Sequence, residues 1–180
     1  MKSKFPFVPA LIFFCLLLES CSTTNQTGTN PPNSTNTAAK HPEHLALKVT
    51  GGSDGSTASA SQISNPFFVT TLSKTIHDAA LFAHIVPSGQ PGAEYQLEVA
   101  IAPLQPPTIG AEMVAIAEAN WTLTRVSNGA IIWQKNISTP HTTNAKEAFT
   151  GIERVQLAIE GAAQDNIKEG ITQLSAISLP

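Results

Sequence analysis

A long alternation of apolar and polar residues, broken once at Asn128-Gly129, constrains the fold of this chain more than any other feature. Within the run from Glu112 to Val126, every second side chain from Met113 to Leu123 is apolar, and a period of two places these side chains on one face of a β-strand. Asn-Gly is typical of tight hairpin turns, so the chain is expected to return as a second strand over Ala130 to Ser138. The apolar faces of this hairpin would carry Met113, Ala115, Ala117, Ala119, Trp121 and Leu123, then Ile131, Trp133 and Ile137.

Two shorter alternations predict further strands. Tyr95 to Ile101 alternates Tyr, Leu, Val and Ile with Gln, Glu and Ala, and Leu45 to Val49 shows the same pattern over a shorter length. Loops are expected at 51–64, which is rich in Gly, Ser and Ala, and at 87–92, which contains Pro and Gly. The loop at 51–64 lacks the Gly-Lys-Ser/Thr ending of a phosphate-binding loop.

Two segments have the spacing of amphipathic helices. The first is predicted to begin with Asn65 as N-cap and Pro66 as first helical residue, and to run to about Ala83. The second is predicted to begin with a capping box over 144–147, Asn-Ala-Lys-Glu, and a short strand is expected after it. Its apolar stripe is Phe149, Ile152, Val155, Ile159, Ala163, Ile167, Ile171 and Leu174.

Three glycines, Gly151, Gly161 and Gly170, lie inside the second helix. Each costs up to ~1 kcal/mol relative to alanine, and close approach of the helix to the sheet is one compensation. The predicted order is strand, helix, strand, strand, strand, helix. It predicts an α+β two-layer sandwich, in which two helices cover a mainly antiparallel sheet.

The amino-terminal segment has the pattern of a bacterial lipoprotein signal. Lys2 and Lys4 precede an apolar stretch over 5–18 that is shorter than the roughly 20 residues of a membrane span. Leu18-Glu19-Ser20-Cys21 then resembles a lipobox, from which only Glu19 departs. We expect residues 1–20 to be a lipoprotein signal peptide, Cys15 to be removed with it, and Cys21 to carry the acyl chains. The alternative is an ordinary signal or short anchor with an incidental cysteine.

The residues after Cys21 indicate the destination and the domain boundary. Ser22 and Thr23 lack the aspartate that retains bacterial lipoproteins in the inner membrane, which favours the outer membrane and its periplasmic face. Residues 21–43 are rich in Ser, Thr, Asn and Pro and are expected to form a disordered tether, because they cannot bury enough apolar surface to fold. Residues 44–180 are then one domain.

Composition excludes several classes of function. Removal of residues 1–20 leaves eight basic and twelve acidic side chains, a formal charge of −4, and a nucleic-acid partner would favour a basic surface. With Cys21 acylated no free thiol remains, which excludes thiol catalysis and cysteine-based metal sites.

Other chemically suggestive residues have simpler interpretations. His41-Pro42-Glu43-His44 is more consistent with solvated linker than with a metal site. Glu112 and Glu118 are about 20 Å apart along a strand, too far for a glycosidase pair. We expect Trp121 and Trp133 to pack in the core or on the sheet, and Glu160, Asp165 and Glu169 to form a solvated helix face. Neither catalysis nor a cofactor is expected.

Three stretches suggest a family resemblance: "AEYQLEVAIAPL", "ANWTLTRVSNGAIIWQKNIS" and "AFTGIERVQLAIEGAAQDNIKEGITQL". Together, over residues 66–175, they resemble the auxiliary lipoproteins of ABC-type lipid transport systems. The same order also resembles the TolB amino-terminal domain and the activator lipoproteins of penicillin-binding proteins. The resemblance implies a non-catalytic, lipid-anchored accessory of an envelope machine for transport or cell-wall synthesis, with an envelope protein as partner. The alternative is a binder of lipids or hydrophobic ligands, with an apolar groove between helices and sheet.

Overall fold

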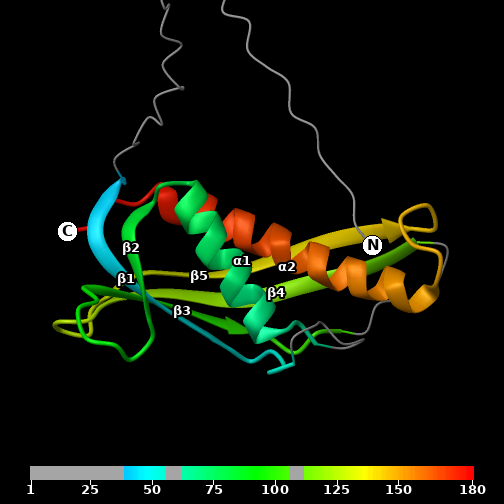
Figure 1. Cartoon of the computed structure of the whole chain (residues 1–180), viewed down its shortest axis with the longest axis horizontal. Coiled ribbons are helices and arrows are strands. Elements are labelled where there is room, and N and C mark those ends of the chain that lie inside the picture. The colour runs from blue at the N-terminus through cyan, green and yellow to red at the C-terminus, as the bar shows by residue number, and fades with distance from the viewer. Residues whose placement is uncertain (1–38, 56–61, 106–111) are drawn as a thin grey trace, which may run out of the picture. The chain divides into compact units, whose positions relative to one another are not determined.

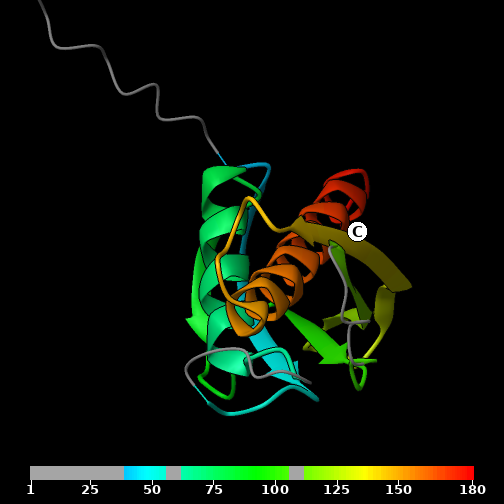
Figure 2. The same cartoon turned by 90° about the vertical axis from the view of Figure 1, so that its right-hand side faces the viewer.

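A five-stranded sheet carries two helices on one of its faces (Figures 1 and 2). The computed structural model describes residues 39–55, 62–105 and 112–180. The first helix packs over the strands at one edge, the second packs over the strands at the other, and the helices also contact each other. The elements are β1 (His41–Thr50), α1 (Asn65–Asp78), β2 (Phe82–Pro87), β3 (Tyr95–Ile101), β4 (Glu112–Arg125), β5 (Ile131–Asn144) and α2 (Gly151–Ser175).

The sheet has the order β2-β1-β3-β4-β5 and confirms the predicted α+β fold class. β1 pairs in parallel with both β2 and β3, whereas β3–β4 and β4–β5 are antiparallel. The two longest strands, β4 and β5, form the predicted hairpin around Asn128-Gly129. In its register Trp121 is opposite Lys135 and Leu123 is opposite Trp133, so the two tryptophans are not paired with each other.

The sequence prediction missed one strand, β2. We predicted that the first helix runs to Ala83, but α1 ends at Asp78 and the chain turns at Ala80, which has a positive φ of 45°. Glycine or asparagine normally occupies this backbone region, so the alanine gave no sign of the turn. The strand that follows pairs in parallel with β1, and α1 forms the crossover that such a pairing requires.

Other element boundaries also differ from prediction. α1 has Ser64 as its N-cap, not Asn65, and the Ser64 hydroxyl accepts a hydrogen bond from the Phe67 backbone N–H at 3.3 Å. β5 continues to Asn144 instead of ending at Ser138, so the predicted capping box at 144–147 is wrong. The capping box of α2 is formed by Thr150 and Glu153, and residues 177–180 form no strand.

α2 lies so close to the sheet that two of its glycines leave no room for a methyl group. A Cβ added at Gly170 would lie 2.5 Å from the Trp121 ring, and one added at Gly161 would lie 2.3 Å from the His141 ring. Close approach therefore explains these two glycines, as the sequence suggested. Gly151 differs, because its added Cβ would meet only Met113, at 3.7 Å.

A buried amide joins α2 to the hairpin. Asn166 is fully buried, and its side-chain N–H groups donate to the main-chain oxygens of Ala117 at 3.2 Å and Ile137 at 2.9 Å. Its side-chain oxygen accepts from the Trp121 indole N–H at 3.0 Å. Every polar atom of this amide and the indole therefore has a partner, which a buried polar group requires.

Candidate functional site

Cys21, the predicted lipidation site, lies outside the described residues, as do the predicted signal peptide and the tether as far as residue 38. Acylation of Cys21 therefore remains a prediction from the sequence. Neither helix in the described part of the chain is both long and apolar enough to cross a bilayer.

The histidines at 41 and 44 belong to β1, not to a solvated linker as we predicted. His41 is buried and its ring lies 5.0 Å from the ring of Phe82. Burial lowers the pKa of His41, the neighbouring Lys40 lowers it further, and Glu43 opposes both. Within 39–55, 62–105 and 112–180, no group of three or more His, Cys, Asp or Glu side chains is placed to hold a metal ion.

The other residues singled out from the sequence lie mostly where packing was expected. Trp121 is fully buried in the core, and Trp133 is half-buried against it. Glu112 and Glu118 are both exposed on β4.

Asp165 does more than form part of a solvated helix face, because its carboxylate lies 2.8 Å from Nδ1 of His141. The imidazole packs directly against Gly161, so this His–Asp pair joins β5 to α2.

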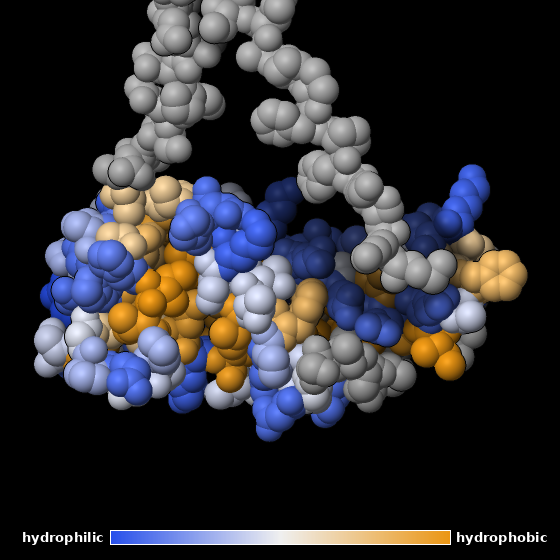
Figure 3. Space-filling view, viewed as in Figure 1, coloured by the Kyte–Doolittle hydropathy of each residue, from blue (hydrophilic) through white to orange (hydrophobic). Residues whose placement is uncertain are grey.

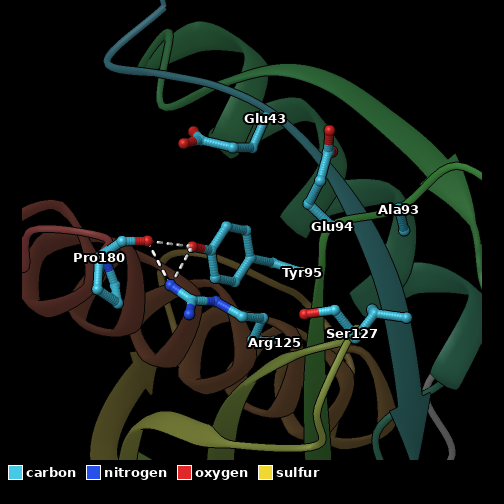
Figure 4. Close-up of a pocket in the computed structure, with 8 residues that line it drawn as sticks. Glu43, Ala93, Glu94, Tyr95, Arg125, Ser127 and Pro180 are labelled. Carbon is cyan, nitrogen blue, oxygen red and sulfur yellow. Dashed lines mark hydrogen bonds between the residues drawn. The ribbon is translucent and has the colours of Figure 1, made fainter.

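The cavity in Figure 4, here called the end pocket, forms where the ends of several elements meet. It has a volume of about 540 Å³. Glu43 comes from β1, Tyr95 is the first residue of β3, Arg125 is the last of β4, and Pro180 follows α2. Ala93, Glu94, Val126 and Ser127 complete its lining.

Hydrogen bonds hold most of the end pocket in place. Tyr95 is buried, and its hydroxyl donates to the main-chain oxygen of Pro180 at 3.1 Å. Nη2 of Arg125 donates to the same oxygen and, at 3.3 Å, to the Tyr95 hydroxyl. The carboxylate of Glu94 accepts from the backbone N–H of His44 at 2.6 Å. The lining is therefore largely preformed.

Glu43 is the exception in this network. Its Oε2 atom is shielded from solvent and has no hydrogen-bond partner within the described part of the chain. Figure 4 shows its carboxylate directed into the space beside Tyr95 and Pro180, on the opposite side of the Tyr95 side chain from Arg125. A shielded, unpartnered carboxylate oxygen is costly, and a ligand that donates a hydrogen bond would satisfy it.

Sequence reasoning missed the end pocket because its residues are far apart along the chain. Glu43 was assigned to the tether, and Pro180 directly follows the short strand that was predicted up to Leu179. The parallel pairing of β1 with β3 places Leu45 opposite Tyr95, and the antiparallel pairing of β3 with β4 places Tyr95 opposite Arg125. The local sequence signal was Arg125 at the end of β4, and a charged residue next to a solvated loop is too common to indicate a site.

A second feature, here called the apolar tip, lies at the start of α2 and consists of Phe149, Ile152 and Leu157. The exposed fractions of Phe149 and Ile152 are 97% and 81%, which contradicts our assignment of both residues to the buried stripe. A hollow of about 470 Å³ lies beside Phe149 and Leu157, and its lining also includes Glu147, Ala148, Glu153 and Gln156. At the right-hand end of Figure 3, where α2 begins, apolar side chains reach the surface among hydrophilic ones.

The end pocket and the apolar tip lie at opposite ends of α2. Nζ of Lys40, directly before β1, donates to the main-chain oxygen of Ser175, the last residue of the helix. The apolar tip is at the first residues of the same helix. At 1.5 Å per residue, 25 residues separate the two ends by about 37 Å. The chain therefore enters the domain beside the end pocket and far from the apolar tip.

The fold is shared with solved bacterial proteins of low sequence identity. A Xanthomonas campestris protein of the DUF330 family superposes with a TM-score of 0.55 at 11% identity, covering 78% of this chain and 89% of that one. PelC from Paraburkholderia phytofirmans, solved as a dodecamer, gives 0.51 at 16% identity, covering 78% and 91%. A candidate lipoprotein from Caulobacter crescentus CB15 gives 0.50 at 15% identity, covering 73% and 87%. No protein-family model and no curated protein sequence matches the chain. At these identities the likeness concerns the fold.

Proposed function

We propose that this chain is a non-catalytic lipoprotein of the bacterial envelope, anchored through Cys21 and facing the periplasm from the outer membrane. In this role it is an accessory or assembly subunit of an envelope machine for transport or cell-wall synthesis. The lipobox-like Leu18-Glu19-Ser20-Cys21 supports the anchor. Two or more acyl chains on one cysteine would hold the chain stably in a bilayer, whereas a single chain binds reversibly. The fold shared with a candidate lipoprotein is consistent with this role.

The observation that carries the contact role is the apolar tip. Phe149, which is 97% exposed, lies directly before the N-cap of α2, and Ile152, which is 81% exposed, lies in the first turn of this helix. Single exposed apolar residues are ordinary, but grouped ones beside a hollow are typical of interaction sites. Burying each side chain in a partner would stabilise the complex by about 1.5–3 kcal/mol. Because the chain enters at the other end of α2, a protein partner bound at the apolar tip would lie at the end of the helix that is distant from the entry of the tether.

The alternative function, binding a hydrophobic ligand between helices and sheet, has less support. It would need an open apolar space between the layers, whereas α2 touches the sheet at Gly161 and Gly170 with no room for a methyl group. The end pocket and the hollow at the apolar tip lie at the ends of α2, away from this interface. Polar side chains, among them Glu43, Glu94 and Arg125, line much of the end pocket.

The anchor is tested by labelling growing cells with an alkyne analogue of palmitate. The wild-type chain is expected to take up the label and to fractionate with the outer membrane. Cys21→Ala is expected to lose both properties, and Cys15→Ala serves as the matched control because that cysteine is removed with the signal peptide. Equal labelling and fractionation of wild type and Cys21→Ala would show that the lipobox interpretation is wrong.

The contact role is tested by placing a photo-crosslinking amino acid at Phe149 in cells. The matched control carries it at Lys168, which is exposed on the same helix but distant from the apolar tip. We expect a defined crosslinked protein from position 149 only, and a crosslink back to this chain when the reactive group is moved onto that protein. Identical products from both positions, or none from either, would argue against the apolar tip as a docking site.

A further inference from the structure

The end pocket lies where a membrane anchor would hold the domain. Glu43 follows Lys40 by three residues, and Lys40 is the residue through which the preceding chain meets the domain. This inference rests on the anchoring part of the proposed function. If Cys21 holds the chain in a bilayer, the tether enters the domain at the end that holds the end pocket and keeps this end within reach of the bilayer, so lipid headgroups are ligands at raised local concentration there.

The end pocket contains both a hydrogen-bond acceptor and hydrogen-bond donors that have no partner among the described residues. On one side of the Tyr95 side chain, Oε2 of Glu43 is shielded and lacks a donor. On the other side, Arg125 makes its hydrogen bonds to Tyr95 and Pro180 through Nη2 alone. A guanidinium has five N–H donors, so the three on Nη1 and Nε have no partner within the described residues and remain free for an anion. An acceptor without a donor and donors without an acceptor therefore share one cavity.

We propose that the end pocket binds the zwitterionic headgroup of a membrane phospholipid, with its ammonium on Glu43 and its phosphate on Arg125. The ligand must carry a hydrogen-bond donor, because Oε2 of Glu43 has none, and a cationic donor would also pair with the negative charge of the carboxylate. A primary ammonium, as in ethanolamine, meets this requirement, whereas the trimethylammonium of choline has no N–H to donate. The chemistry thus selects a phosphoethanolamine headgroup over phosphocholine, and both over an anionic headgroup that has no ammonium.

Tyr95 reports directly on ligand binding in the end pocket, because it is the only tyrosine in the sequence and lines that pocket. The mature acylated protein is prepared in detergent micelles with a ¹³C-labelled tyrosine ring, so that one ring signal reports the end pocket. The probes are short-chain phosphatidylethanolamine and phosphatidylcholine, free phosphoethanolamine, ethanolamine and inorganic phosphate. Free phosphoethanolamine distinguishes recognition of the headgroup itself from recognition of an intact lipid.

We expect a saturable shift of the Tyr95 signal with phosphatidylethanolamine, and a smaller or absent shift with phosphatidylcholine. Glu43→Gln and Arg125→Gln are each expected to weaken this binding by about tenfold or more, since each removes one charge-assisted interaction. The matched control is Glu118→Gln, an exposed carboxylate on β4 that does not line the end pocket. It should bind as the wild type does.

Three results would overturn the headgroup proposal. An equal response to inorganic phosphate and phosphatidylethanolamine, or binding unaffected by Glu43→Gln, would show an anion site without the ammonium contact. Absence of any saturable shift would show that the end pocket takes no headgroup. Palmitate labelling of Cys21 is unaffected by either result, so failure of this inference can be told apart from failure of the proposed anchor.

Discussion

Replacing the three glycines of α2 one at a time tests how closely the helix packs on the sheet. The Cβ of Gly170→Ala would lie 2.5–2.7 Å from three ring atoms of Trp121. An ordinary contact begins near 3.4 Å, so the helix or the indole must move by about 1 Å. The indole is fully buried and its N–H is bonded to Asn166, so neither moves without loss of packing or of that hydrogen bond.

The net change in the free energy of unfolding of Gly170→Ala combines a loss from overpacking and a gain from helix propensity. Overpacking a close-packed site costs about 1–3 kcal/mol, and straining the Trp121–Asn166 bond adds about 1 kcal/mol. Alanine in place of glycine in a helix returns up to about 1 kcal/mol. We therefore expect Gly170→Ala to lower the free energy of unfolding by about 2 kcal/mol. Gly161→Ala should lower it less, because the His141 ring is one-third exposed and can swing outward, at the expense of its bond to Asp165.

Gly151→Ala is the matched control, since its Cβ would make an ordinary contact with Met113. It should leave the stability unchanged or raise it slightly. The measurement is urea unfolding of the mature chain in a Cys21→Ser background, followed by tryptophan fluorescence and by circular dichroism. If Gly170→Ala proved as stable as the wild type, or if all three variants behaved alike, α2 would not be seated on Trp121 as described.

Three further variants address other interactions. Asn166→Ala should lower the free energy of unfolding by about 3 kcal/mol in the same assay, because the Trp121 N–H and two main-chain oxygens lose a buried partner. Because the pKa of His41 is lowered in the folded state, the unfolded chain binds more protons in the pH range below about 6.5. The free energy of unfolding should therefore be highest above about pH 6.5 and should fall as the pH drops toward the folded-state pKa of His41. His41→Gln should make this pH dependence weaker in urea unfolding experiments across the same pH range. Thr150→Ala removes the N-cap of α2 and should cost about 1 kcal/mol, seen as a lower thermal midpoint, whereas an unchanged midpoint would show that the capping box with Glu153 contributes nothing.

The elements predicted correctly from the sequence have a strong alternation of apolar and polar residues and are bounded by residues typical of turns. β3 runs from Tyr95 to Ile101 as predicted, and Asn128-Gly129 marks the turn of the β4–β5 hairpin. In these elements one face is buried and the other is not, so the pattern of residue types reflects the structure directly.

The prediction of the start of α2 was wrong because the capping-box contact at 144–147 is present but no helix begins there. Asn144 and Glu147 do make the reciprocal contact of a capping box in part, since the Glu147 carboxylate accepts from the Asn144 backbone N–H at 2.7 Å. This contact closes a turn after β5, and the helix begins only after Thr150. Sequence spacing alone did not distinguish the two motifs.

The end pocket was not predictable in the same way. Its members come from four segments, and their meeting depends on β1 being inserted between β2 and β3. Strand order follows from the total packing of the sheet and helices, which no short window of sequence encodes. The apolar tip was missed for a related reason. Phe149 and Ile152 fit the helical stripe in spacing, but Phe149 lies before the N-cap Thr150, outside the helix, and Ile152 is exposed in its first turn.

The position of β1 has a mechanical consequence. The chain preceding His41 would transmit any tension from a membrane anchor, and β1 lies between two strands that run in its own direction. A force directed along β1, between this entry and a partner held at the far end of α2, acts parallel to the strand and across its hydrogen bonds on both sides. These bonds must then yield together, in shear, and would not open one after another as in peeling. The arrangement suits a domain that is pulled at its entry, because the entry strand is hydrogen-bonded to a neighbouring strand on each side.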